Sequence, residues 1–203
     1  MMPCQCGTIG AAKEIRFCSD HHRYWIGDRQ LESVTHAVNS VYPRKSFDGV
    51  DPAVVEHARE RGVRVDGYLT QYVTTGHVVR PAGEWKEVDD RLERCIDWWD
   101  KNVNGQRVEC QKILYSERDG IAGTADFVFD GYVLDLKNTA QPEASWALQF
   151  GAYGEYADAH RVAALHSTKD SCRLIEYDAA ECRELWREAM RWRATLARIE
   201  ARK

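Results

Sequence analysis

The sequence predicts a mixed α/β (α+β) fold in which helices flank a central mixed β-sheet. Apolar residues recur at helical spacing up to residue 101, and the pattern then changes to short runs of β-branched and aromatic residues separated by turns. The predicted order is helices, three strands, a helix, two strands and a final helix. The length of 203 residues fits one domain with at most a small appendage.

The segment before residue 50 is predicted to contain a strand, a short helix and a loop. Tyr24–Ile26 has strand character and is followed by a turn at Gly27–Asp28. Ser33 is suited to cap a short helix, and Pro43 and Asp48–Gly49 mark the loop that follows it.

Two longer helices are predicted next, over residues 52–75 and 84–101. Asp51 can cap the first, and Pro52 suits its first turn because the proline lacks the N–H group that would be left unpaired there. The second carries apolar residues at helical spacing, namely Val88, Leu92, Cys95, Ile96 and Trp99.

The remaining elements alternate between sheet and helix. Turns at Asp119–Gly120 and Asp130–Gly131 separate three strands, and the second turn is a strong hairpin signal. The strands are predicted over 107–115, 121–129 and 132–137, a helix over 143–159, two more strands over 161–167 and 171–177, and a final helix after the cap Asp178.

Composition and charge exclude some classes of protein. A net charge of −4 argues against a tail-type nucleic-acid binder, whose affinity comes from excess lysine and arginine, but permits an enzyme with an acidic metal site. No apolar run approaches the length that crosses a bilayer, and the N-terminus lacks the pattern of a secretory signal. We therefore expect a cytoplasmic protein without a membrane partner.

The predicted hairpin GIAGTADFVFDGYVLDLK carries the most informative residues. Asp126 lies on one arm, and Asp135 and Lys137 lie on the other. Residues i and i+2 of a strand share a face, so Asp135 and Lys137 point together while Leu134 and Leu136 point into the core. Adjacent carboxylates repel unless a cation joins them, and hard oxygen ligands favour Mg²⁺ or Mn²⁺. The simpler alternative is an Asp-Lys pair on the solvated face of an ordinary hairpin.

The surroundings of these residues resemble the RecB-like branch of the PD-(D/E)xK nucleases, which includes the exonucleases of CRISPR adaptation. Gly123-Thr124-Ala125-Asp126 and Asp135-Leu136-Lys137 match its Gly-x-x-Asp and Asp-x-Lys strands. Gln149 and Tyr153 match its Gln-x-x-x-Tyr motif on the next helix, where residues four apart share a face.

The resemblance implies a restriction-endonuclease-like core in a nuclease domain over residues 24–203. It implies that Asp126, Asp135 and the carbonyl of Leu136 hold Mg²⁺ or Mn²⁺. It further implies that Lys137 assists the attacking water, and that Gln149 and Tyr153 orient the lysine or the DNA strand.

An upstream histidine of this branch, which follows an Arg-Gly pair, has no counterpart in the chain. Arg61–Gly62 is present, but Asp66 stands at the histidine position. Aspartate also binds hard cations, so we expect Asp66 to be a metal ligand, although the substitution leaves open whether the site is complete and active. A helix-surface role for Asp66 and a ligand role for His57 or Glu60 are alternatives. Glu109 is expected to be a solvated strand residue.

A separate zinc-binding element is predicted over residues 1–23. Cys4-Gln5-Cys6, Cys18 and His21 supply thiolate and imidazole ligands in two close pairs, which suit tetrahedral Zn²⁺. His22 is an alternative fourth ligand, and unrelated reduced thiols are the alternative to the whole site. The odd total of seven cysteines argues against a disulfide framework.

The resemblance to the RecB-like nucleases implies a Mg²⁺- or Mn²⁺-dependent deoxyribonuclease, in particular an exonuclease acting on single- or double-stranded DNA ends. Recombination, repair or phage replication is the expected setting. Two other functions stay open, namely a nucleic-acid-binding module that keeps the nuclease fold and a zinc-dependent regulator. Self-association or a recombination partner protein is also open.

Overall fold

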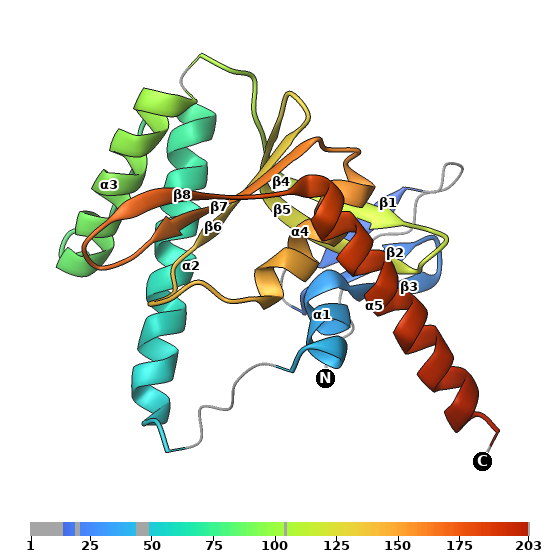
Figure 1. Ribbon diagram of the computed structural model, residues 1–203. Coiled ribbons are helices and arrows are strands. Elements are labelled where there is room, and N and C mark those ends of the chain that lie inside the picture. The colour runs from blue at the N-terminus through green and yellow to red at the C-terminus, as the bar shows by residue number, and fades with distance from the viewer. Residues whose placement is uncertain (1–13, 19–20, 44–48, 104, 203) are drawn as a thin grey trace.

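The centre of the computed structural model, which describes residues 14–18, 21–43, 49–103 and 105–202, is an eight-stranded mixed sheet (Figure 1). The order along the sheet is β1-β2-β3-β5-β6-β7-β8, and β4 pairs with β5 off this path. The strands are β1 (Ile15–Cys18), β2 (Arg23–Ile26), β3 (Arg29–Ser33), β4 (Glu109–Ser116), β5 (Ile121–Phe129), β6 (Tyr132–Lys137), β7 (Arg161–Ser167) and β8 (Cys172–Tyr177).

Parallel and antiparallel pairing are combined in this sheet, as predicted. β3 runs parallel to β5, and β6 runs parallel to β7, whereas the other neighbouring strands are antiparallel. Helix α4 (Ser145–Tyr156) lies between β6 and β7 in the chain, so it supplies the crossover that a parallel pair requires.

Helices begin where the sequence places their caps. Ser33 accepts a bond from the His36 N–H at 3.1 Å before α1 (Val34–Val41), and Asp51 accepts one from Ala53 at 2.9 Å before α2 (Pro52–Thr75). Asp178 caps α5 (Ala179–Glu200) in the same way. None of the helices in the described parts of the chain is long and apolar enough to span a membrane.

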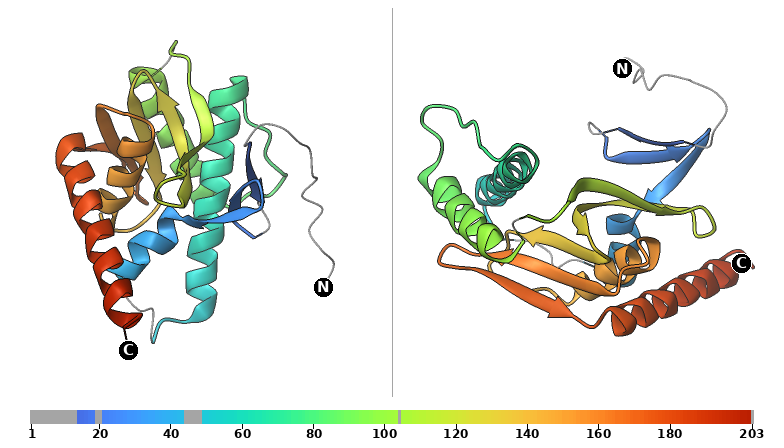
Figure 2. Two further views of the ribbon diagram at one scale, coloured as in Figure 1. Left: turned by 90° about the vertical axis from the view of Figure 1, so that its right-hand side faces the viewer. Right: turned by 90° about the horizontal axis from the view of Figure 1, so that it is seen from above.

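The helices form a layer on each face of the sheet (Figures 1 and 2). Helices α2 and α3 (Lys86–Asn102) pack on one face, where Phe127, Leu134 and Leu136 belong to their apolar cluster. Helices α1, α4 and α5 cover the other face, in the cluster that contains Val128 and Val133. Strands β5 and β6 are therefore covered on both sides, which agrees with the predicted flanking of the sheet by helices.

The N-terminal strands differ most from the prediction. Strands β1 and β3 were not predicted, because each is only 4 or 5 residues long and β3 buries a single residue, Leu31. Too few apolar positions alternate there to give a periodic signal. Within the described residues, Ile15–Cys18 of the predicted zinc element is the edge strand that pairs with β2.

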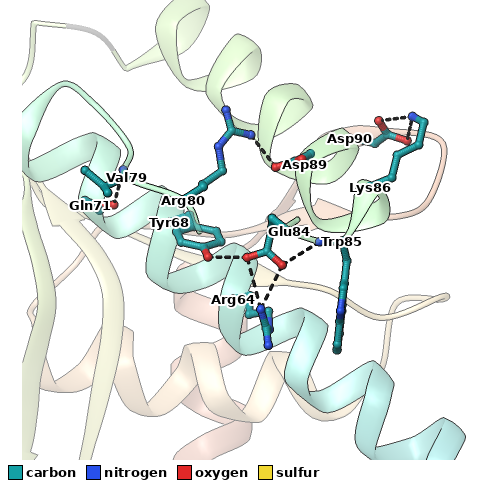
Figure 3. Close-up of polar contacts among 10 residues, drawn as sticks. All are labelled: Arg64, Tyr68, Gln71, Val79, Arg80, Glu84, Trp85, Lys86, Asp89 and Asp90. Carbon is teal, nitrogen blue, oxygen red and sulfur yellow. Dashed lines mark hydrogen bonds and ion pairs between the residues drawn. The ribbon is translucent and has the colours of Figure 1, made fainter. Parts of the chain in front are cut away.

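Helix α3 begins two residues later than predicted because Glu84 is held by α2. Its carboxylate is 2% exposed and accepts bonds from Arg64 at 3.0 Å and from Tyr68 (Figure 3). It also accepts the backbone N–H of Trp85 at 2.8 Å, and the Arg64 guanidinium lies over the Trp85 ring. These contacts fix the α2–α3 connection.

Helices α4 and α5 approach closely at Gly151. A Cβ atom at this position would collide with the backbone carbonyl of Cys182 and lie 2.7 Å from the Trp186 Cβ. Gly154, one turn later on α4, has space, since its nearest neighbour would be Val162 Cγ1 at 3.4 Å.

We predict that Gly151→Ala lowers the free energy of unfolding by about 1–3 kcal/mol, because α5 must shift to admit the methyl group. Gly154→Ala is the matched control and should be neutral or stabilising by up to about 1 kcal/mol, since alanine favours helices over glycine. Urea denaturation of both variants measures the difference. Equal effects would contradict close packing at Gly151.

Candidate active site

Asp126 lies on β5 at the point where this strand separates from β6. The ladder between the strands pairs Phe129 with Tyr132 and ends with Phe127 paired to Leu134. Beyond it, the backbone N–H of Leu136 donates to Asp126 Oδ2 at 2.7 Å. The Asp126 carboxylate thus accepts the hydrogen bond that a backbone carbonyl of β5 would accept in a regular ladder.

Asp135 and Lys137 point to one side of β6, as predicted. Lys137 Nζ lies 2.5 Å from Asp135 Oδ2, and the Asp135 residue is 4% exposed. Leu134 and Leu136 between and beside them belong to the opposite core, under α2 and α3. The alternative of a solvated Asp-Lys pair is therefore excluded by burial.

Gln149 and Tyr153 connect this pair back to β5. Lys137 Nζ donates to Gln149 Oε1 at 2.6 Å, and Gln149 Nε2 donates to the Tyr153 hydroxyl at 3.1 Å. The Tyr153 hydroxyl donates to the carbonyl of Thr124 at 2.9 Å. One chain of bonds therefore joins β6, α4 and β5, and it includes the predicted residues Lys137, Gln149 and Tyr153.

Gly123 explains why glycine stands three residues before Asp126. A Cβ atom there would lie 2.8 Å from Cε1 of Tyr153 and 2.9 Å from Cγ2 of Val34. Only glycine lets the tyrosine ring approach the strand, so the glycine and the tyrosine of the two motifs meet in space.

Asp66 reaches the same cluster from α2. Its Oδ1 atom is buried without a hydrogen-bond partner. Burial first, and the charge of Asp135 second, raise the pKa of Asp66 to about 6. Burial, followed by the charges of Asp135 and Asp66, raises the pKa of Asp126 well above its ordinary value. Asp66, Asp126 and Asp135 are thus electrostatically linked across β6, β5 and α2.

The alternative ligands on α2 have other partners. His57 Nε2 pairs with Glu87, and its ring stacks on Trp85 with centroids 4.3 Å apart. The negative charge of Glu60 contributes, after Glu56, to the raised pKa of the Arg59 guanidinium. Glu109 pairs with Lys112 at 2.6 Å and its side chain is 59% exposed, as expected of a solvated strand residue.

The acidic residues suit a hard divalent cation. Three carboxylates, one with an unpartnered buried oxygen, are the donor set that Mg²⁺ or Mn²⁺ prefers. A cation would offset the burial and the repulsion that raise the pKa values of Asp66 and Asp126. In the described parts of the chain, no group of three or more His, Cys, Asp or Glu side chains is already arranged to hold a metal ion. The Leu136 N–H holds the Asp126 carboxylate, and the Lys137 ammonium holds that of Asp135. The carboxylates would therefore have to move toward one another to bind an ion.

Gln111 is a site residue that the sequence did not reveal. Its Nε2 atom lies 3.3 Å from Asp126 Oδ1 and 3.5 Å from Asp66 Oδ2. An exposed glutamine within a strand matches no motif, and its position opposite Asp126 becomes visible only once β4 and β5 are paired.

The predicted zinc ligands are described only in part. Cys4 and Cys6 lie outside the described residues. Cys18 Sγ lies 3.4 Å from His21 Nδ1, so this pair is close in space. His22 instead packs edge-on against Phe17 and Tyr24.

We predict that Asp66→Asn stabilises the protein in the presence of EDTA at neutral pH. The folded protein binds the Asp66 proton more tightly than the unfolded chain, because its folded pKa of about 6 exceeds the ordinary 3.8. The Asp66 contribution is therefore most favourable below pH 4 and declines as the pH rises through 6, by about 3 kcal/mol.

Urea denaturation between pH 4 and pH 8 measures this dependence. The advantage of Asp66→Asn over the wild type should grow with pH, whereas Asp97→Asn on the exposed Asp97–Lys101 pair should show no such trend. A variant that is less stable than the wild type at pH 8 would contradict the raised pKa of Asp66.

Comparison with known proteins gives the fold. No protein-family model and no curated protein matches the chain. A candidate exonuclease from Eubacterium rectale aligns over 84% of this chain and 81% of its own, at 14% identity and a TM-score of 0.56. The alkaline exonuclease LHK-Exo from Laribacter hongkongensis aligns over 84% and 93% at 13% identity, with a TM-score of 0.39. The first of these similarities shows that the chain shares the fold of the Eubacterium rectale protein.

Proposed function

We propose that the chain is a metal-dependent DNA nuclease of the PD-(D/E)xK type, in its RecB-like branch, which hydrolyses phosphodiester bonds. The observation that supports this most directly is the bond network from Asp135 through Lys137, Gln149 and Tyr153 to the strand of Asp126. The motif residues came from three separate sequence segments, and they meet at one place.

Asp66, Asp126 and Asp135 are the residues that would hold Mg²⁺ or Mn²⁺, together with the Leu136 carbonyl. When bound, such an ion lowers the pKa of water and stabilises negative charge on a phosphate. Asp126 is already oriented for this role by the Leu136 N–H, and Asp135 by Lys137.

Lys137 is placed to act on the reacting groups. Asp135 and Gln149 use two of the three N–H donors of its ammonium, and the third suits an attacking water or a phosphate oxygen. Gln149 is held in turn by Tyr153, so the position of the ammonium depends on α4. Gln149 and Tyr153 therefore serve as positioning residues for Lys137.

DNA ends are the proposed substrate, and exonucleolytic cleavage in recombination, repair or phage replication is the proposed role. The motif resemblance supports both, and the fold shared with a candidate exonuclease agrees with them. A protein with this site that binds DNA without cutting it would instead be a nuclease-fold binding module.

We predict that Lys137→Met reduces DNA cleavage by about 10²–10⁴-fold, because a methionine fills the site but supplies no positive N–H donor. Labelled linear and circular DNA, single- and double-stranded, is incubated with Mg²⁺ or Mn²⁺, and cleavage is followed on gels. Lys101→Met, on the solvated outer side of α3, is the control and should cleave normally.

Cleavage by folded Lys137→Met at the wild-type rate would rule out the assigned role. Tight DNA binding by the wild type without cleavage in either metal would favour the binding module. Cleavage confined to linear substrates would support the exonuclease assignment, and cleavage of circular DNA would contradict it.

We also propose that the N-terminal cysteines form a structural zinc site with Cys18 and His21. The 3.4 Å contact between Cys18 Sγ and His21 Nδ1 supports one half of this site. Elemental analysis should find about one zinc per chain in the wild type and a loss of zinc in Cys18→Ser, with Cys110→Ser as control. Equal zinc content in wild type and Cys18→Ser, or none in the wild type, would contradict the proposal.

A further inference from the structure

The backbone of Gln111 is unusual for a residue inside a strand. Its φ angle is +51°, in the left-handed region that residues with a Cβ rarely adopt. Cys110 and Lys112 on either side pair normally with Phe127 and Ala125, but the ladder leaves out Gln111 and the facing Asp126. Such local outliers gather at functional sites, where surrounding structure maintains them.

The side chain of Gln111 bridges two of the proposed metal ligands. Its Nε2 atom lies 3.3 Å from Asp126 Oδ1, 3.5 Å from Asp66 Oδ2 and 3.4 Å from Thr70 Oγ1. It thus joins α2 to β5 at the carboxylates themselves. These distances are long for a single hydrogen bond, so the amide is shared among several acceptors and is not locked to one.

The side-chain amide of Gln111 can interact favourably with the acidic centre both in the absence and in the presence of a cation. Its NH₂ group donates to carboxylates, and its oxygen can accept a bond or ligate a hard cation. A half-turn about the last side-chain bond exchanges the two ends, and this bond has a broad torsional preference. A carboxylate would add a fourth negative charge to those of Asp66, Asp126 and Asp135, and an ammonium would repel the cation.

We propose that Gln111 is a positioning residue of the acidic centre. Its amide nitrogen holds the carboxylates of Asp66 and Asp126 toward each other in the metal-free protein, and its amide oxygen turns toward the cation when one binds. This role rests on the proposed function, because it requires that Asp66 and Asp126 bind a divalent ion.

A simple structural tie between α2 and β4 is the competing explanation. It accounts for the contacts, but it gives no reason for an exposed side chain to require a left-handed backbone directly opposite Asp126. It also predicts that removal of the amide changes stability and leaves metal affinity unaltered. The two explanations therefore differ in measurable ways.

Two variants of the full chain separate them, namely Gln111→Met and Gln111→Glu. Mn²⁺ affinity is measured by calorimetry, and the thermal midpoint is measured in EDTA and in Mn²⁺. Gln111→Met keeps the length without the amide, and it should weaken Mn²⁺ binding about tenfold. Gln111→Glu should melt below the wild type in EDTA but gain more from Mn²⁺ than the wild type gains. Gln30→Met, at an exposed position of β3, should match the wild type in both measurements.

Unchanged Mn²⁺ affinity in Gln111→Met, or a Gln111→Glu variant whose midpoint responds to Mn²⁺ no more than the wild type, would overturn this role alone. A wild-type protein that binds no Mn²⁺ would overturn both this role and the proposed metal-dependent function. Loss of Mn²⁺ affinity in the methionine variant together with the larger response of the glutamate variant would support it.

Discussion

The repulsion among Asp66, Asp126 and Asp135 is the constraint on which the rest of the site depends. Burial and neighbouring negative charge raise the pKa values of Asp66 and Asp126, so the folded chain holds these carboxylates at a cost in stability. Folding brings them together from a helix and two strands, and ordinary core packing gains nothing from such an arrangement. A centre that binds a cation gives the arrangement a physical reason.

The surrounding structure keeps the acidic centre open while holding its parts in place. Strands β5 and β6 separate at Asp126. There the Leu136 N–H donates to the Asp126 carboxylate, and the Lys137 ammonium pairs with the Asp135 carboxylate. Gly123 admits the Tyr153 ring, and through Gln149 this ring determines where the ammonium lies. Close contact of α4 with α5 at Gly151 anchors the helix that carries both residues. Distant packing therefore bears directly on the chemistry of the site.

Most of the fold was predictable because its elements carry strong local signals. Ser33, Asp51 and Asp178 cap their helices where the sequence indicates, and the Asp130–Gly131 turn closes the hairpin of Asp126 and Asp135. Strands β1 and β3 escaped prediction because few of their residues are buried. The carboxylate-lysine set was predictable because spacing of two in a strand and four in a helix fixes which side chains share a face. Gln111 was not, since its role arises from pairing between strands and from a left-handed backbone that glutamine does not signal.

Anomalous X-ray diffraction from crystals grown with Mn²⁺ tests the central claim most directly. The account predicts a manganese peak bonded to carboxylate oxygens of Asp126 and Asp135, at about 2 Å from each. The absence of a manganese peak between Asp126 and Asp135 at saturating Mn²⁺, with both side chains in the arrangement described above, would contradict the metal site.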